Sequence, residues 1–147
     1  MQLTQHSSKT LFNLLGGISV LGSEPLDLQA AIHAGLPFKS YDLFVRTTAL
    51  TLPEQAQLFG LALRSVNRLR ADRKPLNPVA SDRLVRMARL VGELLNLWHG
   101  DKARVMAWLR SPNTALNEKR PMELLDTDPG VRLVENVING LKYGGFA

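Results

Sequence analysis

The sequence contains no cysteine, which excludes disulfides, thiolate zinc sites, iron–sulfur clusters and cysteine nucleophiles together. Histidine is also scarce. His6, His33 and His99 lie far apart, and none has a partner at metal-ligand spacing. We therefore expect neither a metal site nor a bound cofactor.

Long apolar runs are missing too, since no stretch approaches the roughly 18 to 20 residues that a membrane span requires. Residues 1–22 lack the basic start and the apolar block of a signal peptide. Hydrophobic residues make up 45% and charged residues 21% of the 147 residues, close to the average for soluble globular chains. We expect a folded, cytoplasmic protein of one domain or two small ones.

Strand-like alternation of apolar and polar residues is absent, whereas helical periodicity recurs along the chain. The pattern predicts an all-α fold, a helical bundle with a small helical C-terminal domain. The expected helices outside the central segment cover Lys9–Leu15, Leu26–Ala34, Lys39–Ala49, Ser81–Trp98, Asp101–Leu109, Pro121–Leu125 and Asp128–Leu141.

Caps are expected at several helix ends. The side chain of Ser81 or Asp82 can accept hydrogen bonds from the first backbone N–H groups of the Ser81–Trp98 helix. Gly100 can adopt the left-handed conformation that ends a helix. Asp101 is expected to cap the next helix. Asp128 followed by Pro129 predicts the cap of the last one.

The central segment predicts a helix-turn-helix. Thr51 and Glu54 have the spacing of a capping box, so a helix opens near Leu52. Gly60 allows a sharp turn, and a second helix follows over about 62–71. Two helices joined by a short glycine-containing turn are the layout whose second helix lies in the DNA major groove.

Positive charge gathers in the same segment. The net charge is +5 and the pI about 10.0, and residues 51–75 hold five basic but only two acidic groups. In the second helix Leu63, Val66 and Leu69 can face the core. The remaining polar positions predict DNA contacts: Arg64, Ser65, Asn67, Arg68 and Arg70 towards bases or phosphates, and Arg73 and Lys74 towards phosphates. The alternative is a solvated helix face without a ligand.

The C-terminal stretch carries a more specific pattern. Residues 107–113 read AWLRSPN, residues 120–127 read RPMELLDT, and Gly130, Val134-Glu135 and Tyr143-Gly144 follow. In order and spacing these pieces resemble the toxin-binding domain of the Xre/MbcA/ParS antitoxins. Together with the helix-turn-helix, the resemblance covers about residues 40–147. The chain departs from it at Asn117-Glu118, where relatives often carry glycine.

The resemblance implies an antitoxin of a type II toxin-antitoxin system, typically paired with a RES-domain toxin that degrades NAD. It implies that the C-terminal domain blocks the toxin's substrate site while the helix-turn-helix binds promoter DNA for autoregulation, and that the chain is itself no enzyme. A homodimer that spans two half-sites is expected. The division is then an extension (1–39), an Xre-like helix-turn-helix region (40–100) and a toxin-binding domain (101–147).

Toxin contacts are expected at the end of the chain. The candidates are Asn136, Asn139, Lys142, Tyr143, Gly144, Gly145, Phe146 and Ala147. The two glycines allow the end of the chain to enter a narrow cleft, and the two aromatic rings can fill apolar pockets. The terminal carboxylate can take the place of a substrate phosphate. The alternative is a frayed terminus. Trp108, Leu124 and Leu125 are expected in the core rather than in contact with the toxin.

Rival functions differ in their partners. No GxSxG, HExxH or GxxxxGK[ST] motif is present, which argues against an enzyme. A stand-alone transcriptional regulator, whose C-terminal half only dimerises, needs no toxin. If the chain is a scaffold without DNA affinity, replacing Arg64 and Arg68 by alanine should not change DNA binding.

Overall fold

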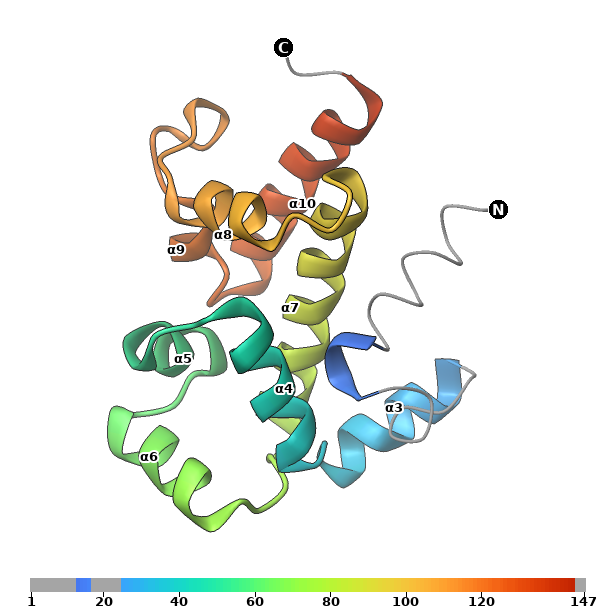
Figure 1. Ribbon diagram of the computed structural model, residues 1–147, viewed down its shortest axis with the longest axis vertical. Helices are drawn as coiled ribbons and strands as arrows, with labels where there is room; N and C mark the ends of the chain where they lie inside the picture. Colours follow the sequence, from blue (N-terminus) through green and yellow to red (C-terminus); the bar gives the residue numbers. More distant parts are fainter. Residues whose placement is uncertain (1–12, 17–24, 145–147) are drawn as a thin grey trace. The chain divides into compact units, whose positions relative to one another are not determined.

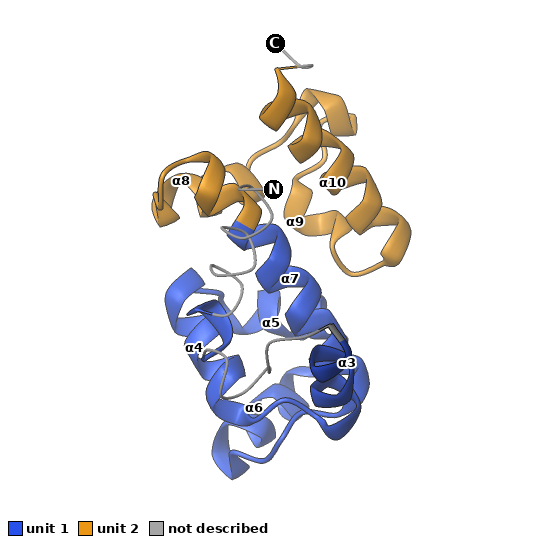
Figure 2. Cartoon of the chain, turned by 90° about the vertical axis from the view of Figure 1, so that its right-hand side faces the viewer, with its two compact units in different colours: residues 1–92 blue, residues 93–147 orange. Residues whose placement is uncertain are grey.

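The computed structural model describes residues 13–16 and 25–144. Within those ranges the regular structure is helical, and the one strand-like feature is an isolated antiparallel bridge between Asn113 and Lys119. The all-α prediction is confirmed (Figure 1). The chain divides into two compact units, Met1–Gly92 and Glu93–Ala147, which are described separately (Figure 2). The three-part division by function stays a prediction.

Unit 1 contains the helices α3 (Pro25–Ala34), α4 (Phe38–Thr48), α5 (Leu52–Phe59), α6 (Leu63–Asp72) and α7 (Pro78–Leu97), the last of which ends in unit 2. The helices expected at Leu26–Ala34 and Lys39–Ala49 are confirmed to within a residue at each end. Of the helix expected at Lys9–Leu15, residues 13–15 are helical, and residues 9–12 lie outside the described ranges.

Helix α7 is amphipathic, and its apolar side supplies much of the core of unit 1. Leu84, Val85, Ala88, Leu90 and Val91 all have less than 3% of their surface exposed. The other helices of unit 1 and the segments between them add fully buried side chains to the same core: Leu36, Phe44, Leu58, Phe59 and Val66. This core fixes the positions of the shorter helices.

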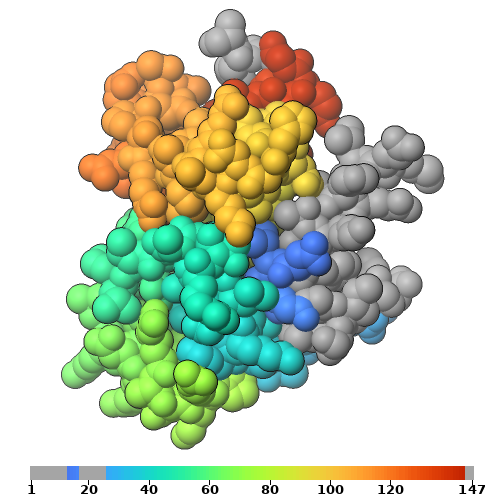
Figure 3. Space-filling model, viewed as in Figure 1, coloured from blue at the N-terminus to red at the C-terminus, as the bar shows by residue number. Residues whose placement is uncertain are grey.

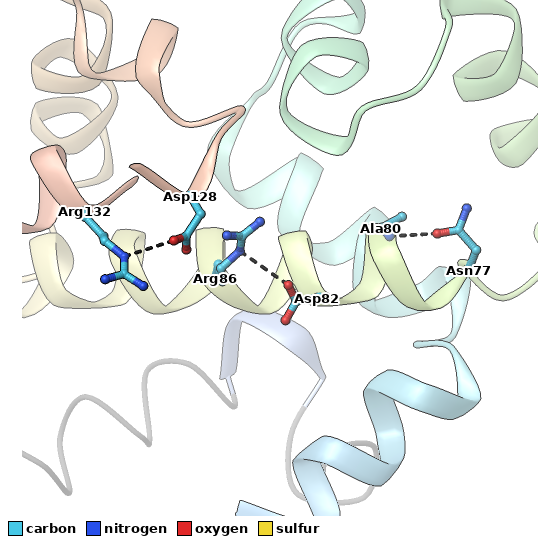
Figure 4. A network of polar contacts seen from close by, with 6 residues as sticks. All are labelled: Asn77, Ala80, Asp82, Arg86, Asp128 and Arg132. Atoms are coloured by element: carbon cyan, nitrogen blue, oxygen red, sulfur yellow. Dashed lines mark hydrogen bonds and ion pairs between the residues drawn. The ribbon is translucent and has the colours of Figure 1, made fainter. Parts of the chain in front are cut away.

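The predicted cap of α7 is wrong by one turn. Asn77 caps the helix, because its Oδ1 accepts from the backbone N–H of Ala80 at 2.8 Å (Figure 4). Ser81 lies inside the helix and is fully buried, and its Oγ accepts from the backbone N–H of Leu36 at 2.9 Å. Asp82 forms an ion pair with Arg86 at 3.6 Å. Both residues predicted as caps therefore make other contacts within unit 1.

Unit 2 contains the end of α7, then α8 (Lys102–Arg110), the short 3₁₀ helix η1 (Thr114–Leu116), α9 (Pro121–Leu124) and α10 (Asp128–Tyr143). Asp101 caps α8 as predicted, since its Oδ1 accepts from Arg104 N–H at 3.0 Å. Gly100 has the expected positive φ of 83°. In α10 the apolar positions Val131, Val134, Val137 and Ile138 form the buried face.

The cap of α10 lies one residue before the predicted one. Thr127 Oγ1 accepts from the N–H of Gly130 at 3.1 Å, and Asp128 is the first helical residue. Asp128 instead pairs with Arg132 one turn later, at 3.0 Å (Figure 4). A carboxylate in the first turn still favours the helix through its dipole.

The residues expected in the core of unit 2 differ in their burial. Leu125 is buried, with 3% exposed, whereas Leu124 and Trp108 are half-buried. Trp108 packs edge-to-face against Trp98, with ring centroids 6.0 Å apart. The guanidinium of Arg104 covers the Trp98 ring at 4.8 Å. These three side chains form a partly exposed cluster rather than a sealed core.

Candidate functional site

Helix α5 begins at a complete capping box. The backbone N–H of Thr51 donates to Glu54 Oε1 at 2.9 Å, and Glu54 N–H donates to Thr51 Oγ1 at 3.3 Å. Pro53 occupies the first turn, where it costs no hydrogen bond. The sequence prediction of a helix start here is confirmed.

Gly60 makes the turn between α5 and α6. Its φ of 64° is left-handed, and its N–H donates to the carbonyls of Ala56 and Gln57. The N–H of Leu61 also donates to Ala56 O, at 2.9 Å, which closes the end of α5. The guanidinium of Arg83 from α7 lies beside Gly60. A Cβ atom on residue 60 would be only 2.4 Å from Arg83 Nη1. The turn of the helix-turn-helix therefore packs against α7.

Helix α6 is attached through one face only. Val66 is fully buried, and Leu61 and Leu69 are half-buried beside it. The prediction that Leu63 faces the core is wrong, since 52% of its surface is exposed. Leu63 is the first residue of the helix and lies about 60° around the helix from Val66, outside the packed side.

The predicted DNA-binding residues lie along the outer side of α6. Arg64, Asn67, Arg68 and Arg70 are exposed, and Ser65 is half-buried. In Figure 3 the green atoms of α6 lie at the surface of unit 1. One element therefore presents three arginines and an asparagine together, the groups that pair with guanine, phosphate and adenine.

The two cations beyond α6 differ in their setting. Arg73 has a left-handed φ of 55° and ends the helix, with its N–H donating to Leu69 O at 2.9 Å. Its guanidinium lies 5.8 Å from the centroid of the Phe38 ring in α4. Lys74 is exposed. Arg73 is thus oriented by an aromatic face, and Lys74 is not held by any contact of that kind in the described residues.

A buried polar chain fixes α5 against α4. The hydroxyl of Tyr41 donates to Gln55 Oε1, and Gln55 Nε2 donates to Leu50 O at 3.0 Å. Both side chains have only 1% of their surface exposed. Burial raises the pKa of Tyr41 to about 12, although the positive charge of Arg70 acts in the opposite direction. These positioning residues were not predicted, because nothing in the local pattern marks a glutamine as buried.

The described residues contain no cluster of three or more histidine, aspartate or glutamate side chains that could hold a metal ion. No helix in the described ranges is long and apolar enough to cross a membrane.

The second set of predicted residues lies on α10. Asn136, Asn139 and Tyr143 are exposed, on the side of the helix opposite its buried valines, and Gly144 is exposed at the C-cap that ends the helix. Leu133, on the same helix, is 52% exposed and was not predicted as a contact residue. Its position one turn before Asn136 is the sequence signal that could have identified it. Gly145, Phe146 and Ala147 lie outside the described residues.

Lys142 is engaged within unit 2. Its Nζ lies 3.4 Å from Glu93 Oε2, and the two side chains are only 28% and 23% exposed. A partner that used Lys142 would have to share or displace this ion pair.

Comparison with known proteins assigns both regions. Residues 27–89 match the antitoxin Xre-like helix-turn-helix domain, and residues 93–144 match the antitoxin Xre/MbcA/ParS C-terminal toxin-binding domain. The chain belongs to the Xre/MbcA/ParS antitoxins. The relatives that it resembles carry corresponding names.

One relative is the antitoxin Xre of Photorhabdus laumondii, 26% identical over 117 residues that cover 80% of this chain and 79% of the relative. Another is the antitoxin Xre of Yersinia enterocolitica, 31% identical over 88 residues, or 60% of each chain. The Prs ADP-ribosylating antitoxin of a Sphingobium strain is 26% identical over 133 residues, covering 85% of this chain and 84% of the relative.

The family match agrees with the geometry of the antitoxin. The helix-turn-helix match contains α5, Gly60 and α6, and the toxin-binding match contains α8, α9 and α10. The antitoxin therefore combines a helix-turn-helix with a domain for a toxin partner.

Proposed function

We propose that this antitoxin binds and blocks the active site of a cognate RES-type, NAD-degrading toxin through unit 2 and represses its own operon by binding promoter DNA through α6. The observation that carries the proposal is that one chain contains two features. An exposed, arginine-rich helix, α6, follows the turn at Gly60, and a separate unit matches a toxin-binding domain. The antitoxin acts in the cytoplasm and is not itself an enzyme.

The DNA half of the proposal rests on α6. Arg64, Asn67 and Arg68 contact base edges in the major groove, and Ser65 and Arg70 contact bases or phosphates. Arg73 and Lys74 contact phosphates. The single recognition helix of one chain offers few contacts. The antitoxin therefore acts as a homodimer whose two α6 helices occupy two half-sites.

The toxin half rests on α10 and the residues that follow it. Asn136, Asn139 and Tyr143 are exposed on one helix, and Lys142 adds a positive charge near its end. The final residues, from Gly144 to Ala147, enter the toxin's substrate cleft. The name of the Sphingobium relative refers to ADP-ribosylation, a reaction that consumes NAD, which supports a toxin of NAD chemistry.

The toxin half is tested by co-expressing the antitoxin with the protein encoded beside it and measuring cellular NAD. Full-length antitoxin should form a stoichiometric complex and preserve NAD. A version ending at Gly144 keeps every described helix and should still bind while NAD falls. A version ending at Leu141 should bind less well, since it also removes Tyr143 and the Lys142–Glu93 ion pair.

The same experiment distinguishes the rival hypothesis. If the neighbouring protein forms no complex and does not lower cellular NAD, the proposed binding and blocking of a RES-type toxin is wrong. A chain that nevertheless binds its own promoter region would then act as a stand-alone regulator.

A further inference from the structure

Leu63 is an exposed apolar side chain on the helix that carries the exposed Arg64 and Asn67. It is 52% exposed, whereas Val66 on the same helix is fully buried. Its neighbours on the exposed side of α6 are Arg64 and, one turn later, Asn67. The basic side chains around it complement the phosphates of a nucleic acid rather than an apolar protein surface.

The position of Leu63 on the helix restricts what it can contact. It is the first residue of α6, and the N-terminal residues of a recognition helix are those that reach base edges. Leu63 and Asn67 stand four residues apart, so their side chains are neighbours, with Cβ atoms about 5 to 6 Å apart. The Asn67 amide can form hydrogen bonds with the edge of an adenine, whereas the leucine side chain beside it can neither donate nor accept one.

One base edge in the major groove is apolar. Thymine carries a C5-methyl group there, and side chains without polar atoms recognise thymine through it. We infer that Leu63 is a specificity residue that packs on a thymine methyl at one position of the operator, next to the base pair contacted by Asn67. This inference rests on the proposed DNA binding by α6 and adds the base that it selects.

The test removes the methyl group from DNA and the side chain from the protein. Duplexes that bind the full-length chain are selected from a random-sequence library, and each thymine is then replaced singly by uracil, which pairs identically but lacks the methyl. With the natural chain, one thymine in each half-site should give a loss of about fourfold on replacement, the effect of one buried methyl or methylene group.

The variant Leu63→Ala should bind the thymine duplex about as weakly as the natural chain binds the uracil duplex, and should no longer distinguish the two. Leu26→Ala is the matched control, because Leu26 is a leucine of unit 1 with 77% exposure on α3 rather than α6. It should retain the full preference for thymine.

Each other result overturns the inference. A thymine preference that persists in Leu63→Ala would assign the methyl contact to another residue. Salt-dependent, sequence-selective binding that no uracil replacement weakens would exclude methyl recognition while leaving DNA binding intact. Absence of DNA binding in any duplex would remove the proposed function of α6, and this inference with it.

Discussion

The carbonyl oxygen of Leu124 lies where a side chain on Gly130 would begin. A Cβ built on Gly130 would be 1.8 Å from that oxygen and 2.8 Å from the carbonyl carbon. The end of α9 and the first turn of α10 therefore approach each other closely at this point. Both contacts are with backbone, so a side chain at position 130 cannot be accommodated by a rotamer change.

Gly130→Ala should destabilise the antitoxin by about 3 kcal/mol or more, since relief requires the backbone to move. The measurement is denaturant unfolding of the full chain. Gly100→Ala is the control for a glycine in open space, because nothing lies within 4 Å of its built Cβ. Its positive φ alone should cost about 1 to 2 kcal/mol. Equal losses in the two variants would show that the close approach is unimportant.

Glu118→Gly should stabilise the chain. Asn117 and Glu118 both have positive φ, 54° and 64°, in the turn between η1 and α9. A left-handed conformation costs an L-residue roughly 1 to 2 kcal/mol, which exceeds the entropic cost of glycine, so a net gain of about 0.5 to 1 kcal/mol is expected. Glu118→Ala should give no gain, because alanine has the same backbone restriction. A decrease on Glu118→Gly would contradict this account of the turn.

Stability should fall between about pH 10 and pH 12 through Tyr41. Its pKa is raised from 10.0 to about 12 in the folded chain, so the folded state holds the proton that the unfolded state loses first. The contribution is complete below pH 10 and is lost as the pH rises towards 12. Unfolding of the natural chain and of Tyr41→Phe should be measured across this range.

The phenylalanine variant isolates the contribution of Tyr41 ionisation, because it lacks the hydroxyl. Below pH 10 it should be less stable by about 1 to 3 kcal/mol, because Gln55 Oε1 loses its buried donor. Its stability should then decline less steeply with pH than that of the natural chain. Parallel curves would show that the ionisation of Tyr41 does not contribute.

Arg64→Ala and Arg68→Ala should each weaken promoter binding by about 1 to 3 kcal/mol where the arginine reaches a base edge, and should reduce the salt dependence. Affinity for promoter duplexes at several salt concentrations measures both effects. Arg89→Ala is the control, as an exposed arginine of unit 1 on α7. Promoter binding that neither α6 variant weakens would assign DNA recognition to other residues, whereas the absence of promoter binding in the natural chain would favour the scaffold hypothesis.

The predictable features of the fold are those set by a few neighbouring residues. The capping box of Thr51 and Glu54, the turn at Gly60 and the cap at Asp101 depend on spacing alone, and all three are confirmed. The residues of α6 that suit DNA were all predicted to face solvent. Four of them are exposed, Arg64, Asn67, Arg68 and Arg70, whereas Ser65 is half-buried.

The errors arise where tertiary contacts choose between similar local options. Asn77 and Ser81 lie within about one turn of each other, and both residue types cap helices well. Asn77 is the cap of α7 because the Ser81 hydroxyl instead accepts a hydrogen bond from the backbone N–H of Leu36. Thr127 and Asp128 compete in the same way. Leu63 could not be placed from periodicity, because an apolar residue at the edge of a helix face fits either side.

Both tryptophans of the chain, Trp98 and Trp108, lie in unit 2 and pack against each other. Fluorescence excited at the red edge of indole absorption therefore reports on the toxin-binding unit and is silent about the helix-turn-helix. Since the pair is half-buried, its emission should respond to a protein that covers this unit. A single sample with labelled DNA could thus follow the two partners of the antitoxin in separate optical channels.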